Sequence, residues 1–416
     1  MSLICRPSYL LPKAGTDLFK WSVIACDQFT SQPEYWDRLS HVIGDAPSTL
    51  ALTFPEVYLD KCDNTERTLS IRAAMRSYID DGILIPRSGY VLVKRVMHSG
   101  RERLGLMCEV DLEEYDFSPS SQSLIRATEK TVTERLPVRV DIRTGAPLEL
   151  PHIMLLMDGG KDFMRELDLL RGEVLYDTPL NMDGGRLTGY ALDCDAKIDA
   201  FLSSLSNPAT LMNKYGTRAG IAFAVGDGNH SLATAKVCWD KLKSELPSDR
   251  LKDHPARYAL CELVSLQDSS LEFEPIHRVV FDKAGEFLSY AKSRLSGEGR
   301  VKAYACGSVC ALPAPSDAAQ AIEVIQRVID EYCALSGCTT DYIHGVGDTL
   351  DVAAAGGGTA IIMPLISKDE LFKSVISRGV LPRKSFSMGE GRDKRYYMEA
   401  RVIDDTVSLC AEEIDL

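Results

Sequence analysis

Residues 220–236 constrain the fold more than any other stretch of the chain, because an apolar segment there runs into a polar turn and then into a helical pattern. Residues 220–225 predict a buried strand, and residues 231–242 predict a helix. Gly226 and Gly228 allow a sharp turn with close backbone approach between them. A strand that leads into a helix in this way favours an α/β layer architecture.

The same turn is the best candidate for a functional site. The N-terminus of a helix presents unpaired N–H groups and about half a positive elementary charge, so a phosphate is its natural occupant. Asp227 would repel a phosphate unless a divalent cation bridges them or unless the carboxylate takes a proton from an attacking hydroxyl. Both options point to phosphoryl chemistry. The structural alternative is that Asp227 and Asn229 simply cap the helix.

The turn resembles a signature of the bacterial family DUF1015, which contains Asp-Gly-His-His-Arg and is itself similar to the nucleotide-binding motif of the ParB and free-serine-kinase superfamily. Residues 227–231 read Asp-Gly-Asn-His-Ser, and Thr-Ala follows at residues 234–235. Further blocks resemble the family in the same order along the chain: residues 6–7, 23–27, 105–115 with 125–131, 274–280, and 363–364 with 381–385.

Two departures from the family pattern lie in the turn itself. Asn229 replaces the first His of the signature, and Ser231 replaces an Arg that would grip a phosphate in a fork geometry. The phosphate contact must therefore be weaker or come from elsewhere, and Arg278, Arg383 or Lys384 could supply it. Two more departures, Cys26 before Asp27 and Thr128 before Glu129, mark a divergent branch.

The resemblance implies an α/β (mixed α+β) fold, in which additional mixed-sheet regions accompany a nucleotide-binding core like that of ParB and serine kinase. We expect three consecutive segments. Residues 1–120 form an N-terminal α/β region with a mixed sheet, residues 121–290 form the core that carries the turn, and residues 291–416 form a C-terminal α/β region that closes the site.

The resemblance also implies roles for individual residues. The residues expected to be catalytic are Asp227, His230, Glu129 and Asp27, of which Asp227 and Glu129 would also hold a metal. The residues expected to bind phosphate or nucleotide are Gly226, Gly228, Asn229, Ser231, Arg126, Lys130, His277, Arg278, Arg383, Lys384 and Ser385.

The function implied is that of a nucleotide-dependent small-molecule phosphotransferase, acting on free serine or phosphoserine with Mg²⁺ and ATP, ADP or CTP. One alternative is a phosphohydrolase that uses the same pocket with water as the acceptor. Another is a non-catalytic nucleotide sensor, which the loss of Arg at Ser231 makes credible. The partners expected are a phosphorylated small molecule or an amino acid, and a second copy of the chain in a homodimer.

Composition excludes several classes of partner. The formal net charge is −13, and no helix-turn-helix segment with a basic face is evident, so we expect no nucleic-acid partner. No apolar run approaches the length of a membrane span, and no export signal begins the chain. The 12 cysteines include no Cys-x-x-Cys pair, which indicates free thiols in a reducing cytoplasm.

Local patterns predict the remaining elements. Helices are expected at residues 32–42, 65–81, 196–205, 318–332 and 369–379, and strands at residues 89–97, 104–112, 257–266 and 359–364. The first two strands form a hairpin at the edge of a mixed sheet. Residues 353–358 predict a turn. The basic run at residues 392–395 could neutralise phosphates, although a solvated loop is the reading we favour there.

Overall fold

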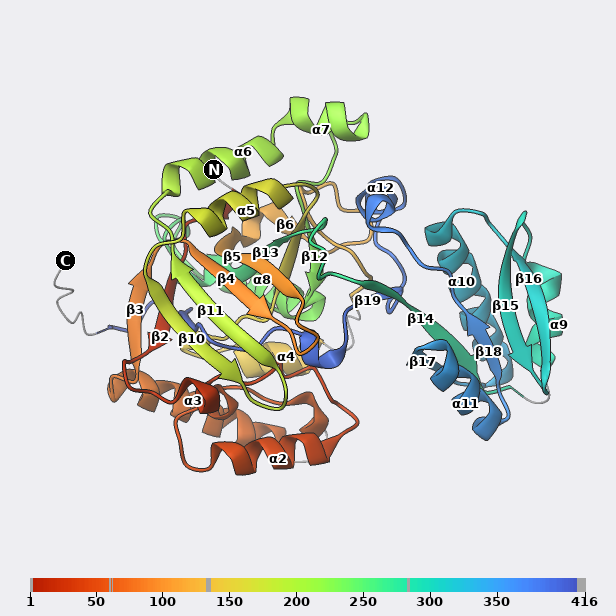
Figure 1. The fold of residues 1–416 in the computed structure, drawn as a ribbon, viewed down its shortest axis with the longest axis horizontal. Coiled ribbons are helices and arrows are strands. Elements are labelled where there is room, and N and C mark those ends of the chain that lie inside the picture. The colour runs from red at the N-terminus through yellow and green to blue at the C-terminus, as the bar shows by residue number, and fades with distance from the viewer. Residues whose placement is uncertain (1–2, 60, 62, 132–135, 283–284, 410–416) are drawn as a thin grey trace. The chain divides into compact units, whose positions relative to one another are not determined.

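The structure, a computed structural model, describes residues 3–59, 61, 63–131, 136–282 and 285–409, which form two compact units (Figure 1). Unit 1 comprises Met1–Ala127, Thr131–Leu271 and Glu390–Leu416, and unit 2 comprises Thr128–Lys130 and Glu272–Gly389. The three predicted segments (1–120, 121–290 and 291–416) do not coincide with these units, because strand pairing between distant residues decides which residues share a core.

Unit 1 is built on a mixed sheet of ten strands among the described residues. In spatial order the strands are β10 (Val174–Leu180), β11 (Gly185–Ala191), β4 (Val91–Val96), β5 (Glu102–Asp111), β13 (Tyr258–Ser265), β9 (Met154–Met157), β12 (Phe223–Asp227), β7 (Ile125–Ala127) and β6 (Tyr115–Asp116), and β1 (Ile4–Cys5) pairs with β5. Two smaller sheets join β2 (Ser8–Pro12) to β3 (Leu84–Ser88) and β8 (Leu148–Glu149) to β20 (Arg401–Val402).

Helices cover both faces of this sheet, because its strands bury side chains on both sides. Val91 and Val93 belong to one hydrophobic core and Leu92 to the other. The helices that contribute to the first core are α1 (Leu18–Trp21), α2 (Pro33–Ile43) and α3 (Asn64–Asp80), and those that contribute to the second are α5 (Lys161–Leu169), α6 (Asp195–Leu205) and α8 (Asn229–Lys243). The α/β prediction is confirmed.

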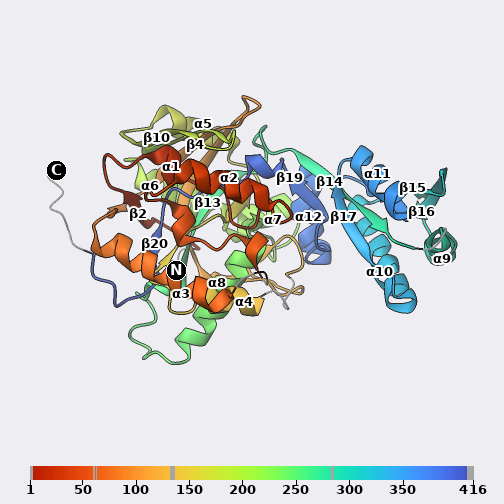
Figure 2. The ribbon, with the colours of Figure 1, turned by 90° about the horizontal axis from the view of Figure 1, so that it is seen from below.

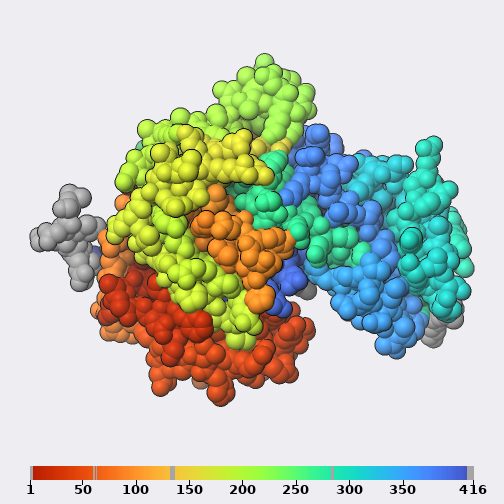
Figure 3. All heavy atoms as spheres, viewed as in Figure 1, coloured from red at the N-terminus to blue at the C-terminus, as the bar shows by residue number. Residues whose placement is uncertain are grey.

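Two further helices of unit 1 lie beside this layered core. Helix α4 (Leu136–Arg143) packs along α8 (Figure 2). Helix α7 (Pro208–Tyr215) follows α6 and forms a lime-green projection on the surface of unit 1 (Figure 3).

The predicted hairpin forms at the predicted residues, but it lies inside the sheet and not at its edge. β4 and β5 pair antiparallel, as expected. The expectation that they form a sheet edge is wrong, because β11 pairs with the outer side of β4 and β13 with the outer side of β5. Both strands bury side chains on both faces of the sheet. In such a position the backbone N–H and C=O groups need hydrogen-bond partners along both edges of each strand, and two neighbouring strands supply them.

Unit 2 contains a second sheet. Its strands in spatial order are β16 (Ser308–Ala314), β15 (Gly299–Ala305), β18 (Thr359–Ile362), β14 (Phe273–Val280) and β17 (Thr340–His344), with β19 (Phe386–Met388) also paired to β14. Its helices are α9 (Glu286–Arg294), α10 (Ala318–Ser336), α11 (Val346–Gly356) and α12 (Lys368–Arg378).

Most of the predicted helices and strands are confirmed to within a few residues. The turn predicted at residues 353–358 is wrong for residues 353–356, which are helical. Helix α11 continues to Gly356 and ends at Gly357, whose φ of 66° is left-handed. Alanine favours helix strongly, so the three alanines before the glycines extend α11 rather than the turn.

Two other expectations concern cysteines and membrane spans. The ten cysteines for which the structure gives a state, Cys5, Cys26, Cys108, Cys194, Cys238, Cys261, Cys306, Cys310, Cys333 and Cys338, are all free. Among the described residues, no helix combines the length and apolar character needed to cross a membrane.

A buried ion network ties the C-terminal segment of unit 1 to its sheet. Arg395 donates from Nε to Glu262 (2.9 Å) and from Nη2 to Glu399 (2.6 Å), and all three side chains are at most 5% exposed. Burial works against the charge on Arg395, but Glu399 and Glu262 raise its pKa above the ordinary value. Charges buried this deeply are tolerated only as a satisfied set.

Replacing Arg395 should therefore destabilise unit 1 strongly. In Arg395→Met, Glu262 and Glu399 lose a shared partner inside the core, which should lower the free energy of unfolding by about 3–5 kcal/mol. All three tryptophans, Trp21, Trp36 and Trp239, belong to unit 1, so urea unfolding followed by tryptophan fluorescence reports on this unit.

The exposed pair Arg186–Asp177 provides the control. Arg186→Met should leave the urea midpoint close to that of the wild type, because solvent screens a surface pair. A loss in Arg395→Met as small as that in Arg186→Met would contradict the account of the buried network.

Candidate functional site

The predicted turn joins β12, the third strand from the β6 edge of the unit 1 sheet, to α8. Gly228 has a φ of 76°, and a Cβ at this position would lie 3.0 Å from the Cα of Ile153, so the turn requires glycine. Helix α8 begins at Asn229, and its first internal hydrogen bond runs from the N–H of Leu232 to the carbonyl of Gly228. The first turn of α8 thus carries N–H groups that have no partner within the helix.

Asp227 is held between this turn and the C-terminal segment. Its Oδ1 accepts the N–H of Gly228 at 3.0 Å, and its Oδ2 lies 3.1 Å from Nζ of Lys394. The Lys394 side chain is only 12% exposed. The solvated-loop reading that we favoured for residues 392–395 is therefore wrong for Lys394, which places a buried cation beside the predicted catalytic carboxylate.

His152, which the sequence analysis missed, links two of the predicted residues. Its Nε2 lies 2.9 Å from Oγ of Ser231 and 3.7 Å from Oδ2 of Asp27. Its Nδ1 lies 2.9 Å from the hydroxyl of Tyr397. The structure thus brings Asp27 and Ser231 to one buried imidazole, although 204 residues separate them in the sequence (231 − 27).

Tyr397 contacts both His152 and Cys26. Its hydroxyl oxygen accepts the N–H of Cys26 at 3.1 Å, and burial raises the pKa of the Tyr397 hydroxyl. The Tyr397 proton has two acceptors, Nδ1 of His152 and the Cys26 sulfur, and the tautomer of His152 differs between the two arrangements. The tautomer with its hydrogen on Nε2 donates to Ser231 and leaves the Ser231 proton for another acceptor.

Backbone pairing between the two ends of the chain positions Asp27. The N–H of Ala25 donates to the carbonyl of Arg395 at 2.9 Å, and the N–H of Tyr397 donates to the carbonyl of Val23 at 2.8 Å. Because the pairing is antiparallel, Asp27 and Lys394 both lie just beyond the same end of the short ladder, one on each segment. The Gln28 amide also donates to Oδ1 of Asp27 at 2.9 Å.

The remaining predicted residues of unit 1 differ in their surroundings. Gly226 ends the regular part of β12, and Asn229 opens α8 with a buried Oδ1 that has no hydrogen-bond partner among the described residues. His230 follows in the first turn, and its carbonyl accepts the hydroxyl of Thr234. Arg126 is buried, and its guanidinium donates to the backbone carbonyls of residues 123, 219 and 220. These bonds stabilise the segment before β12.

The other predicted residues belong to unit 2, where Glu129 contacts the backbone of residues 384–386. Its carboxylate accepts the N–H groups of Lys384 (2.9 Å), Ser385 (2.9 Å) and Phe386 (3.4 Å). Burial raises the pKa of Glu129, and these N–H groups together with the Lys384 ammonium act against that rise. Lys130, next to Glu129, donates its N–H to the carbonyl of Leu381 at 2.8 Å. The three N–H groups that could hold a phosphate are therefore occupied by a carboxylate of the same chain.

Arg278 and Arg383 share the ring of Tyr342. The guanidinium of Arg278 lies 4.5 Å from the ring centroid and that of Arg383 lies 4.7 Å from it. Arg278 is fully buried, donates to Gln326 at 2.7 Å, and has its pKa lowered to about 10 by burial. Of the three cations predicted to replace the missing arginine, only Arg383 and Lys384 are exposed.

His277 serves a backbone group of unit 2. Its Nδ1 accepts the N–H of Met363 at 3.1 Å, and its side chain is buried. Burial lowers the pKa of His277, and the nearby charges of Arg278 and His344 lower it further. The neutral imidazole is therefore the form that supports the pairing of this region.

The two predicted metal ligands do not offer a ready metal site. Asp227 has both carboxylate oxygens engaged by Gly228 and Lys394, and Glu129 has both engaged by backbone N–H groups. They belong to different units. Within the described ranges, no group of three or more His, Cys, Asp or Glu side chains could hold a metal ion.

Comparison with known proteins shows the family. The chain belongs to the family described as "Protein of unknown function (DUF1015)", whose sequence profile matches residues 10–333. A search of curated proteins found no match.

Several solved structures are similar to this chain at low identity. A free serine kinase in complex with AMP shares 12% identity and has a TM-score of 0.40, covering 71% of this chain and 91% of its own. SbnI with a C-terminal truncation, from Staphylococcus aureus, shares 9% identity with a TM-score of 0.40, covering 73% and 90%. A conserved hypothetical protein from Pyrococcus furiosus shares 12% identity with a TM-score of 0.36, covering 68% and 90%.

Acidification should loosen unit 2 through His277. Because folding lowers the pKa of this histidine, the stability it contributes is complete above about pH 6.5 and is lost as the pH falls through the lowered value. We expect the Met363 amide to lose protection against hydrogen exchange, corrected for the intrinsic rate, between about pH 7.5 and about pH 5.

Two variants separate this effect from general acid sensitivity. His277→Gln should flatten the pH dependence of Met363 protection. His344→Gln, at the half-exposed second histidine of unit 2, should keep that dependence but shift it to higher pH, because the His344 charge no longer lowers the pKa of His277. Equal pH dependence in wild type and His277→Gln would show that another group is responsible.

Proposed function

We propose that this protein is a nucleotide-dependent phosphotransferase whose acceptor is a small molecule with a hydroxyl group, of the free-serine or phosphoserine type. The observation that carries the proposal is the arrangement at the N-terminus of α8, where Asp227, Lys394 and the His152–Ser231 pair surround the first-turn N–H groups. The resemblance of residues 227–231 to a nucleotide-binding motif supports the same reading.

In this proposal the first turn of α8 binds the phosphates of the nucleotide. The N–H groups of the turn and the positive end of the helix dipole favour an anion there. Ser231 takes over part of the role of the family arginine. In the tautomer of His152 with its hydrogen on Nε2, the Ser231 oxygen accepts from the ring, so the hydroxyl proton can be donated to a phosphate oxygen.

Lys394 and Asp227 act in sequence. A phosphate that arrives at the turn offers Lys394 a second anion, which draws the ammonium away from Asp227 and stabilises charge on the transferring group. The released carboxylate then accepts the proton of the acceptor hydroxyl. The acceptor oxygen forms a bond to phosphorus as the bond to the nucleotide oxygen breaks, and the nucleotide leaves with one phosphate fewer.

Asp27 has a positioning role in this scheme. Its carboxylate lies 3.7 Å from Nε2 of His152, and the attraction between them helps to keep the imidazole ring oriented toward Ser231. The engaged carboxylates of Asp227 and Glu129 do not fit a resident metal ion as they are arranged, so no step is assigned to Mg²⁺.

A non-catalytic nucleotide sensor is the second candidate. Asp227 is ion-paired and Ser231 stands in place of an arginine, and both features favour binding over turnover. A phosphohydrolase would use the same groups with water as the acceptor, and only its products would differ.

The test follows ³¹P resonances of ATP, ADP and CTP incubated with the protein, Mg²⁺ and L-serine, and separately with phosphoserine. We expect phosphoserine to appear with a matching change in one nucleotide. Asp227→Asn should abolish that change without lowering the melting temperature, because the side chain is partly exposed and keeps its size.

Asp240→Asn is the matched control, since Asp240 lies on the same helix but pairs at the surface with Lys236 and Lys243. This variant should keep wild-type turnover. Release of free phosphate alone would replace the proposal by a hydrolase, broadened nucleotide lines without turnover would replace it by a sensor, and wild-type activity in Asp227→Asn would remove Asp227 from the mechanism.

A further inference from the structure

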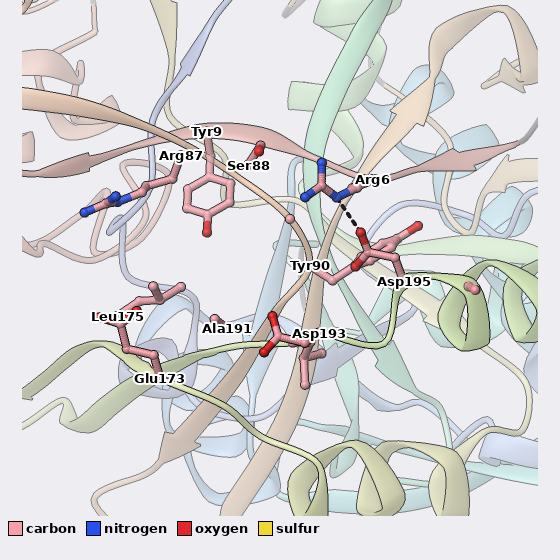
Figure 4. Close-up of a pocket in the computed structure, with 13 residues that line it drawn as sticks. Arg6, Tyr9, Arg87, Ser88, Tyr90, Glu173, Leu175, Ala191, Asp193 and Asp195 are labelled. Carbon is pink, nitrogen blue, oxygen red and sulfur yellow. Dashed lines mark ion pairs between the residues drawn. The ribbon is translucent and has the colours of Figure 1, made fainter. Parts of the chain in front are cut away.

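A cavity of about 500 Å³ opens on unit 1, apart from the turn between β12 and α8. It lies between the small sheet formed by β2 and β3 and the strands β10 and β11 (Figure 4). None of the residues at the N-terminus of α8 lines it. A volume of this size is typical of pockets that hold small molecules.

One side of the cavity offers hydrogen-bond donors. The Tyr9 hydroxyl points into the open space, and it makes no hydrogen bond to any residue that the structure describes (Figure 4). Burial raises the pKa of Tyr9, so the hydroxyl keeps its proton and can donate. Ser88 and Arg87 lie on the same side.

Arg6 adds a positive charge near Tyr9. Its Nε lies 2.6 Å from Oδ2 of Asp195, at the start of α6. This contact uses one edge of the guanidinium, and within the described part of the chain the two Nη groups make no hydrogen bond. The Arg6 side chain is half exposed, so these donors can reach a ligand.

The opposite side carries acceptors. The carboxylate of Asp193 faces the open space across from Tyr9, and Glu173 lies farther along the same side (Figure 4). Neither carboxylate forms an ion pair with a residue that the structure describes. The apolar side chains of Leu175 and Ala191 lie between the charged groups.

We propose that this cavity binds a small zwitterion, an amino acid or a dipeptide, with its carboxylate at Arg6 and Tyr9 and its ammonium at Asp193 and Glu173. The separation of donors from acceptors across the cavity decides the ligand class. A simple anion would face two unpaired carboxylates, and a simple cation would leave the donors of Arg6 and Tyr9 unused. A molecule with both charges satisfies both sides, and its carbon atoms lie against Leu175 and Ala191.

The proposal does not depend on the chemistry at α8. It concerns a different set of side chains, so phosphotransfer could fail while the zwitterion binds, and the reverse could also hold.

Isothermal titration calorimetry of the full chain tests the ligand class. The probes are L-alanine and L-alanyl-L-alanine as zwitterions, L-alaninamide as the matched cation, and propionate as the matched anion. We expect at least one zwitterion to bind, and the two singly charged analogues to bind at least about tenfold more weakly. Binding of the dipeptide alone would identify a peptide ligand, and binding of alanine would identify a free amino acid.

Variants then locate the binding. Tyr9→Phe removes only a hydroxyl and Asp193→Asn removes only a charge, and each should weaken zwitterion binding about tenfold. Asp162→Asn, at a 97% exposed carboxylate on α5, is the matched control and should bind like the wild type. The proposal is overturned if neither zwitterion binds, if either singly charged analogue binds as tightly as the zwitterion that binds, or if both cavity variants bind like the wild type.

Discussion

The backbone pairing between residues 21–25 and residues 395–398 is the interaction on which the candidate site depends. The Trp21 indole donates to the carbonyl of Met398 at 3.0 Å, and the hydroxyl of Ser22 donates to the carbonyl of Tyr397 at 2.7 Å. These bonds add to the ladder between Val23 and Tyr397. Because that ladder carries Asp27 on one strand and Lys394 on the other, the two groups reach α8 from opposite ends of the sequence.

Electrostatics makes the same segment distinctive. The chain has a net charge of −13, yet Lys394 is nearly buried against Asp227, and Arg395 next to it is buried and paired with two carboxylates. In the proposed function, a phosphate at the α8 turn competes with Asp227 for Lys394 and is favoured by the positive end of the helix dipole. The Ser231 hydroxyl, 2.9 Å from Nε2 of His152, adds a polar group at the same place.

The sequence predicted the local elements well, because their signals are local. β12 and α8 follow from an apolar run, a required glycine and a helical pattern, and α10 follows from its periodicity. The predicted edge hairpin failed because which strand pairs beyond β4 and β5 depends on chain segments more than 70 residues away. The helix at residues 353–356 was missed because three glycines outweighed the alanines before them.

Site residues were predictable only where a motif named them. Asp227 was found through the pattern of the turn, and Asp27 and Ser231 through the family resemblance; the structure brings Asp27 and Ser231 to one imidazole. His152 has no motif of its own: it is one histidine ahead of an apolar strand, a pattern that is usually structural. Its partner Tyr397 is likewise one of 16 tyrosines, and only tertiary pairing distinguishes it.

A crystal structure of the protein with bound ADP would test the central claim most directly. The account predicts that the terminal phosphate lies within hydrogen-bond distance of the first-turn N–H groups of α8 and of the Ser231 hydroxyl, with Lys394 turned from Asp227 toward it. An ordered ADP whose phosphates lie elsewhere, with the Asp227–Lys394 pair intact, would contradict it.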